Sequence, residues 1–142
     1  MDSDQIHFRA EFTIEEGKTE EFTKLIQDMS RAVETNEPDT IEYKFYLNRN
    51  KTNCIAHETY KNSEAAIAHN NGVASKTILP RIFEISKINR FDVYGSPSEE
   101  LQKVLASFGV KTYYNLFVGF SRQSGRYCGV IDGVYASCSA RA

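Results

Sequence analysis

The sequence of 142 residues lacks several features that would point to particular classes of protein. It has no tryptophan, only three prolines, and no apolar run near the ~20 residues that a membrane-spanning helix needs. The net charge of −2 is too small to imply a strongly charged partner, and the basic residues form no stripe interleaved with aromatics. The first residues are acidic and carry no apolar signal-peptide core. We therefore expect a cytoplasmic protein with no membrane or nucleic-acid partner.

The cysteines are few and form no C-x-x-C pair, so no disulfide framework or zinc ribbon is indicated. Cys54 falls in a strand-like run and is expected to be a small buried hydrophobic residue. Cys128 and Cys138 could pair with each other, but a reducing compartment argues against it. The sequence also has no Gly-rich dinucleotide loop and no phosphate-binding loop, so no cofactor is expected.

Hydrophobic periodicity predicts the order of the elements. Strict alternation between apolar and polar residues is typical of a strand with one buried face, and spacing of three and four residues is typical of an amphipathic helix. Asn62 is a good helix N-cap residue, and Pro80 indicates a kink or a new first helical turn. The expected strands are 5–14, 40–48, 53–61 and 88–95, and the expected helices are 18–35, 62–70 and 78–83.

This β-α-β-β-α-β order predicts an α+β protein with the ferredoxin-like fold. We expect residues 1–95 to form that domain. Residues 96–122 are predicted to extend it with an amphipathic helix over 98–109 and an aromatic extended run over 110–122. Residues 123–142 are rich in Gly, Ser and Ala without a clear period, and their order is left open: a mobile tail, or a strand added to a neighbour.

Three stretches of the sequence resemble one family. They are "EEGKTEEFTKLI", "NEPDTIEYKFYLN" and "HETYKNSEAAIAHN". The last fits the pattern E-x-Y-x-x-x-x-A-x-x-x-H through Glu58, Tyr60, Ala65 and His69. Over residues 5–95 the chain resembles the antibiotic biosynthesis monooxygenase family, also called quinol monooxygenase-like. The resemblance implies a homodimer in which two four-stranded sheets pack face to face as a dimeric α+β barrel.

The same resemblance suggests where a small-molecule substrate would bind. One face of each sheet would lie under its own helices, and the other would face the partner or a cavity. On the first and last strands the cavity face would carry polar side chains, namely His7, Arg9, Glu11, Thr13, Arg90, Asp92 and Tyr94. Because buried polar groups need partners, such a face would suit a ligand.

His69 and Glu58 are the candidate catalytic residues. His69 closes the second helix at the family's histidine position, and its ordinary pKa near 6.5 suits a general base or acid. It could equally be a helix C-terminal histidine stabilised by the dipole. Glu58 is expected to face a polar network, or alternatively to pair with Lys44 or Arg90 across strands. His57 is its neighbour on a strand, so the two side chains point to opposite faces.

Four further residues are candidates for substrate binding: Arg9, Tyr46, Tyr60 and Arg90. The basic residues among them would steady a phenolate, but with Glu11 and Lys44 they could instead form an ionic ladder across strands. A metal is not expected. The spacing of His57 and His69 does not fit a helical H-E-x-x-H site, although a looser site from His7, His57 and His69 is not excluded by spacing.

Three functions are consistent with the sequence. The first is a cofactor-independent monooxygenase acting on a quinol-like or other small aromatic hydroxyl compound, as the resemblance implies. The absence of tryptophan puts haem degradation and some polyketide oxidations in doubt, because those family branches use one. The second is an isomerase or hydrolase acting on a small carbonyl compound. The third is a non-catalytic dimeric module that binds a metabolite, or a partner through residues 96–122.

Overall fold

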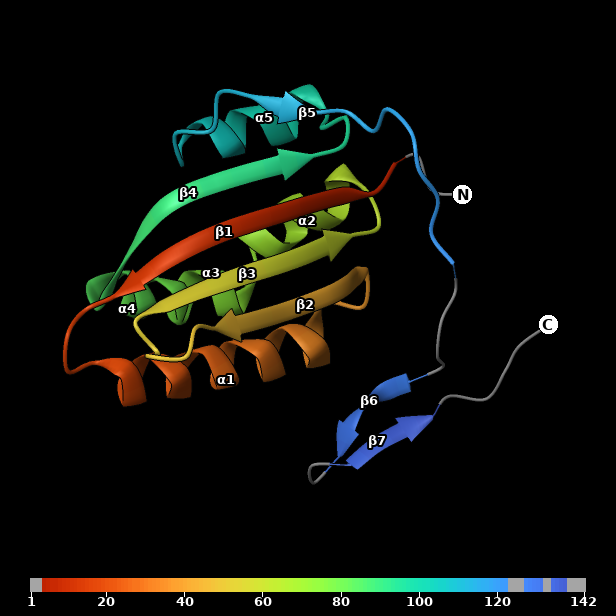
Figure 1. The fold of residues 1–142 in the computed structure, drawn as a ribbon. Helices are drawn as coiled ribbons and strands as arrows, with labels where there is room; N and C mark the ends of the chain where they lie inside the picture. The colour runs from red at the N-terminus through yellow and green to blue at the C-terminus, as the bar shows by residue number, and fades with distance from the viewer. Residues whose placement is uncertain (1–3, 123–126, 132–133, 138–142) are drawn as a thin grey trace.

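A computed structural model describes residues 4–122, 127–131 and 134–137, with side chains for 4–122. Its main feature is a sheet in the order β2-β3-β1-β4-β5, with the helices packed on one face (Figure 1). The predicted β-α-β-β-α-β order and α+β class are confirmed. One chain forms an open sheet and not a closed barrel, so the dimeric barrel stays a prediction.

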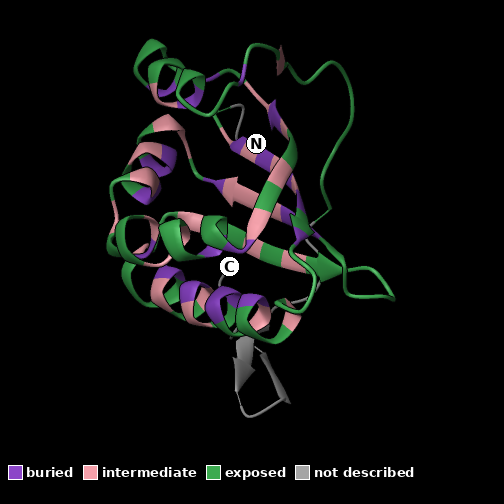
Figure 2. Ribbon diagram, turned by 90° about the vertical axis from the view of Figure 1, so that its left-hand side faces the viewer, coloured by how far each residue is buried: buried purple, intermediate pink, exposed green. Residues whose placement is uncertain are grey.

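The centre of the sheet is β1 (Ile6–Ile14), which pairs antiparallel with β3 (Asn53–Tyr60) and β4 (Ser86–Tyr94). Burial alternates along β1 as the sequence predicts, because successive side chains of a strand point to opposite faces. The buried set faces the helices and includes Ile6, Phe8, Ala10, Phe12 and Ile14. The opposite face of the sheet is partly exposed, as Figure 2 shows.

The long helix α1 (Thr19–Asn36) packs its apolar stripe against the sheet. The stripe consists of Phe22, Leu25, Ile26, Met29 and Val33, and two glutamates in the first turn complement the helix dipole. Pro38 follows directly after the C-cap, where the helix cannot continue. The chain then enters β2 (Thr40–Leu47), which pairs only with β3 and forms one edge of the sheet.

Three short helices connect β3 to β4. The first, α2 (Ser63–Asn70), begins at Asn62, whose side chain accepts a hydrogen bond from the backbone N–H of Ala65 as expected of an N-cap. It is followed by α3 (Val73–Thr77) and α4 (Leu79–Glu84), and Pro80 lies in the first turn of α4. Because a proline at that position loses no helical hydrogen bond, it starts a new helix there.

The C-terminal extension is partly as predicted. Its helix α5 (Glu99–Ala106) packs Leu101 and Leu105 against the helix-covered face of the sheet. Of the extended run expected over 110–122, only β5 (Tyr113–Tyr114) joins the sheet, as a fifth strand parallel to β4. Backbone pairing is also present between β6 (Tyr127–Ile131) and β7 (Val134–Ser137). The predictions about the Cys128–Cys138 pair and the rest of the tail fall outside the described residues.

In the part of the chain that the structure describes, no helix is both long and apolar enough to cross a membrane.

Candidate active site

An apolar cavity lies between the sheet and the helices. Its volume is about 60 Å³, and most of its wall is aliphatic or aromatic, including Phe8, Met29, Ile82, Phe91 and Leu105. Glu58 and His69 add a carboxylate and an imidazole to this wall. The cavity therefore lies under the helix-covered face of the sheet, whereas the polar alternation had pointed to the opposite face.

His69 is buried at the end of α2 and lies between two carboxylates. Its Nδ1 is 2.7 Å from Oε1 of Glu37, and its Nε2 is 3.7 Å from Oε1 of Glu58. The residue is only 7% exposed, so these contacts are shielded from water. Tyr43 and Tyr60 contact the imidazole edge-on or tilted, with ring centroids 5.4 and 5.3 Å away. A histidine packed this way is held in one orientation.

Glu58 projects from β3 on the same face as the buried Tyr60, two residues further along the strand. The hydroxyl of Tyr60 donates a hydrogen bond to Oε1 of Glu58. Among the described residues Glu58 makes no ion pair with Lys44 or Arg90, so the alternative prediction of a cross-strand salt bridge is wrong. The prediction that Glu58 faces a polar network is met by Tyr60 and His69.

The surroundings shift the pKa values of these groups. Burial raises the pKa of Glu58 above its ordinary value, and the nearby imidazole and the Tyr60 hydroxyl only partly oppose this. Burial on its own would lower the pKa of His69, but the hydrogen bond with Glu37 and the two carboxylate charges outweigh it and raise that pKa. Burial and the charge of Glu58 raise the pKa values of Tyr43 and Tyr60 well above 10.0, so both phenols stay protonated.

Glu37 belongs to this cluster, although no sequence pattern indicates it. It is the C-cap residue of α1, and it reaches His69 across a sequence separation of 32 residues. Thr40 donates a further hydrogen bond to its Oε1. In the sequence Glu37 directly precedes Pro38, so it is interpreted only as part of the segment that ends the helix. Only the packing of the end of α1 against α2 brings it to the imidazole.

Three of the predicted substrate-binding residues lie on the other face of the sheet. Arg9 and Arg90 flank Asp92 there, and Tyr46 lies on the same face of β2. The expectation that one cavity holds these residues together with His69 is not met within the described chain, because the sheet separates them. The fourth, Tyr60, is fully buried and directs its hydroxyl to Glu58.

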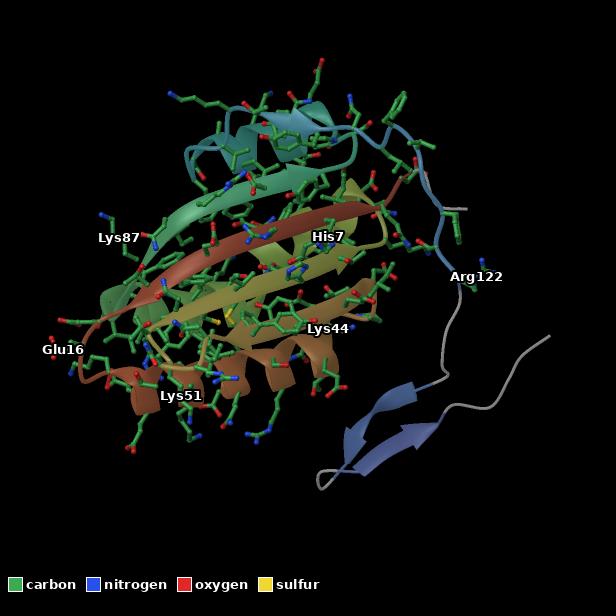
Figure 3. The ribbon with its side chains drawn as sticks, in the orientation of Figure 1. His7, Glu16, Lys44, Lys51, Lys87 and Arg122 are labelled. Atoms are coloured by element: carbon green, nitrogen blue, oxygen red, sulfur yellow. The ribbon has the colours of Figure 1, made fainter. Side chains whose placement is uncertain are left out.

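The charged residues of this open face pair mostly along their own strands, and of the pairs described here only that between Arg9 and Asp92 crosses strands as a ladder would. Arg9 lies 3.3 Å from Glu11 and 3.8 Å from Asp92, and the Nε atom of Arg90 lies 2.9 Å from the same Asp92 carboxylate. A further pair joins Lys44 to Glu42 on β2, and Figure 3 labels Lys44 and His7 on this face. The basic side chains are therefore already paired with acids.

Five aromatic rings also cross the open face from edge to edge. Tyr46, His57, His7, Tyr94 and Tyr114 follow one another across the strands, with successive ring centroids 5.5, 5.4, 5.8 and 5.6 Å apart. His69 is on the opposite side of the sheet from this row. The loose three-histidine metal site is thus not assembled, and no group of three metal-binding side chains occurs among the residues described.

The arrangement under the helices is suited to proton transfer. A carboxylate with a raised pKa and an imidazole with a raised pKa share one wall of an apolar cavity, which is typical of a general acid–base centre. The fold and site define a ferredoxin-like α+β protein with a buried acid–base pair. Its family follows from the sequence: residues 6–80 match antibiotic biosynthesis monooxygenases, and the chain belongs to that family.

Solved structures agree with this assignment. MupZ from Pseudomonas fluorescens is similar with a TM-score of 0.68 at 25% identity, covering 83% of this chain and 94% of that one. SnoaB, a cofactor-independent oxygenase from Streptomyces nogalater, has a TM-score of 0.57 at 12% identity, covering 67% and 95%. A conserved protein from Methanosarcina mazei Go1 has a TM-score of 0.58 at 19% identity, covering 67% and 96%. No curated protein sequence matches the chain.

Proposed function

We propose that this protein is a cofactor-independent monooxygenase for a small aromatic hydroxyl or anthrone-like compound. The observation that carries the proposal is His69, held between Glu37 and Glu58 at the wall of an apolar cavity. Membership of the monooxygenase family supports oxygen chemistry, and the cavity wall suits a flat apolar substrate with one acidic proton.

The first step is removal of that proton. Glu58 takes it, because its raised pKa makes it a stronger base than an exposed carboxylate. His69, kept protonated by Glu37, places a positive charge beside the substrate anion and stabilises it. Tyr60 does not touch the substrate in this scheme. Its hydroxyl holds the Glu58 carboxylate in position.

The anion then reacts with dioxygen. One electron passes from the carbanion to dioxygen, and the resulting radical pair combines to a peroxide that the site protonates. Loss of water from the peroxide converts the original CH₂ carbon into a carbonyl. One oxygen atom ends in the product and the other leaves as water with both hydrogens, so the substrate supplies all the electrons and no further reductant is required.

The cavity sets a condition on substrate binding. Its volume of about 60 Å³ is well below the roughly 300–1,000 Å³ typical of ligand sites, so a multi-ring substrate must displace part of the wall. We propose that two sections of the wall give way. One is the pair of short helices α3 and α4, and the other is Phe108, which is 38% exposed just after α5.

Oxygen uptake tests the proposal. With anthrone or a reduced naphthoquinone as the probe, the protein should consume dioxygen faster than the uncatalysed reaction, without added flavin or metal, and the product should contain one atom from labelled dioxygen. His69→Gln should reduce this rate to near the background. If neither probe is turned over, while binding of either one quenches tyrosine fluorescence, the oxygenase proposal is rejected.

A second candidate function uses the same residues without oxygen. The adjacent Glu58 and His69 could move a proton between two carbons of a small carbonyl compound, and their shared position on the cavity wall favours such an isomerase. Solvent deuterium uptake into a ketone probe, under nitrogen, would identify this activity. Exchange that persists without oxygen and disappears in Glu58→Gln would favour the isomerase over the oxygenase.

The working unit we propose is a homodimer formed through the open face of the sheet. That face is only partly exposed even in a single chain, and it carries the paired charges and the aromatic row. A second copy stacking there would give the face-to-face sheets that the family resemblance implies. Sedimentation of the protein across a concentration series would measure the dimer directly.

A further inference from the structure

The extension ends in an exposed apolar segment, here called the arm, which comprises residues 115–122. Its large hydrophobic side chains are largely in solvent: Leu116 is 74% exposed, Phe117 94%, Val118 76% and Phe120 80%. A single exposed apolar residue is ordinary, but four within five positions form a patch of the kind that marks an interaction site. The core domain offers no cover for them in the described chain.

A matching surface lies at the opposite edge of the sheet. Between α1 and the edge strand β2 is an apolar groove of about 340 Å³, lined by residues including Phe22, Ile26, Phe45, Leu47 and Cys54. In the described part of the chain, no strand pairs with the outer side of β2, so its outward N–H and C=O groups are free. Such an edge can accept an added strand.

The arm is poorly placed to fill the groove of its own chain. It follows β5, and β5 and β2 form opposite edges of the sheet, about 19 Å apart at the usual strand spacing. Figure 1 shows the chain leaving β5 and running past the ends of the strands, and Figure 3 labels Arg122 there. Along this path its apolar side chains are exposed, so in the described chain the arm does not fill its own groove.

We propose that the arm of each protomer pairs as a strand with the β2 edge of the second copy. Alternation along a strand puts Leu116, Val118 and Phe120 on one side, and these three side chains would enter the groove between α1 and β2. Phe117 would then lie on the other side, over the exposed Tyr46 of the partner's open face. This inference rests on the proposed homodimer and specifies how the two chains are joined.

The exchange would also complete the active site. Ile26, Tyr43 and Phe45 line both the groove and the active-site cavity, so they form the wall between them. A partner's arm in the groove would press on that wall from the far side and restrict its movement. The ring of Tyr43 contacts His69 directly, so the arm of one chain would help to hold the imidazole of the other.

Disulfide trapping between two differently labelled chains tests the proposal. In a Cys128→Ser, Cys138→Ser background, one chain carries Gln27→Cys in the groove and the other carries Val118→Cys in the arm. Mixing and mild oxidation should give a disulfide-linked heterodimer, because each chain has only one new thiol. Lys24→Cys, exposed on α1 but outside the groove, is the matched control and should give little product. Cys54 is buried and retained throughout, so this control also measures its background.

Two results would overturn arm exchange. One is a chain carrying both cysteines that closes an intrachain disulfide as a monomer, which would place the arm in its own groove. The other is the absence of any 27–118 product beyond the Lys24→Cys background. If either result occurs while oxygen uptake is normal, arm exchange is rejected and the oxygenase proposal is retained. If the 27–118 disulfide forms but no probe is turned over, arm exchange is retained and the oxygenase proposal is rejected.

Sedimentation gives a second, independent measurement. Val118→Asp with Phe120→Asp should weaken the dimer at least about tenfold, because each change places a carboxylate in an apolar groove. Both residues are exposed in the single chain, so the fold should be unaffected. Val73→Asp, an equally exposed apolar position on α3, is the control. An unchanged dissociation constant in the double variant would contradict the proposal.

Discussion

The two faces of the sheet place histidines in opposite settings. Under the helices, His69 is buried between two carboxylates, which raise its pKa above 6.5. On the open face, His7 lies against His57 with ring centroids 5.4 Å apart, and partial burial together with the second imidazole lowers its pKa below 6.5. The same side chain thus favours the protonated form on one face and the neutral form on the other.

This difference separates a reactive site from a structural surface. The open face has more polar residues. Arg9, Lys44 and Arg90 each lie beside an opposite charge and are partly exposed, whereas Asp92 between the two arginines is buried. The helix-covered face has few polar residues, and they are buried, connected to one another and next to an apolar cavity. Perturbed pKa values beside a cavity are the better indicator of chemistry.

The largest difference in activity should come from replacing a histidine by glutamine on each face of the sheet in turn. His69→Gln removes the positive charge that stabilises the substrate anion and should lower the oxygen-uptake rate by roughly 10²–10³-fold, the usual loss when one group that stabilises a developing anion is removed. His57→Gln on the open face should change it by less than about threefold, since this half-buried side chain lies on the opposite side of the sheet from the cavity. Initial rates with the same probe compare the two variants, and equal losses would mean that the faces do not differ in function.

A second test compares glutamates in free energy of unfolding. Glu37→Ala removes a carboxylate that is 10% exposed and leaves the His69 Nδ1 without its partner, so the cost should be about 1–3 kcal/mol. Glu42→Ala on the open face removes a half-exposed partner of Lys44 and should cost about 0–1 kcal/mol. Urea titrations measure both. If Glu42→Ala lowers the free energy of unfolding as much as Glu37→Ala does, the buried network is no more important for stability than the open one.

How much of this could be predicted from the sequence depends on the range of the interactions. Alternation and helical spacing act locally, and they predict the strand and helix order, the Asn62 cap and the restart at Pro80. The strand-to-helix pattern predicts that Glu58 and His69 belong to one site. The alternation places Glu58 on the same face of β3 as Cys54 and Tyr60, but it cannot show that this face borders a cavity.

Long-range packing was the part that could not be predicted. Glu37 joins the site only because the end of α1 meets α2. The family resemblance implies that the polar face of β1 lines a cavity against a partner chain, and for the single chain this stays a prediction. The cavity that the structure shows lies between the other face of the sheet and the helices, whose packing no periodicity encodes.

The opposite pKa shifts predict opposite pH dependence. The pKa of His69 is raised, so its stabilisation is complete below pH 6.5 and is lost as the pH rises through the folded-state pKa. The pKa of His7 is lowered, so its contribution is present above pH 6.5 and is lost as the pH falls. His69→Gln should therefore flatten the alkaline side of the stability profile, and His7→Gln the acidic side. Histidine proton shifts in NMR measure both pKa values, and shifts of the same sign would contradict the contrast.

The smallest effect should come from Gly72→Ala, which alters the surroundings of His69 without replacing any titrating group. An added Cβ would lie 3.1 Å from Oε2 of Glu37 and 3.3 Å from the carbonyl oxygens of Ala68 and His69. The carboxylate must move by a few tenths of an ångström, which lengthens its bond to the imidazole and should lower the pKa of His69 towards 6.5. The open face is remote, so the pKa of His7 should stay constant in the same NMR titration. A fall in both values would mean that the two faces are coupled through the sheet, whereas a fall in His69 alone would identify Glu37 as the residue that keeps the imidazole protonated.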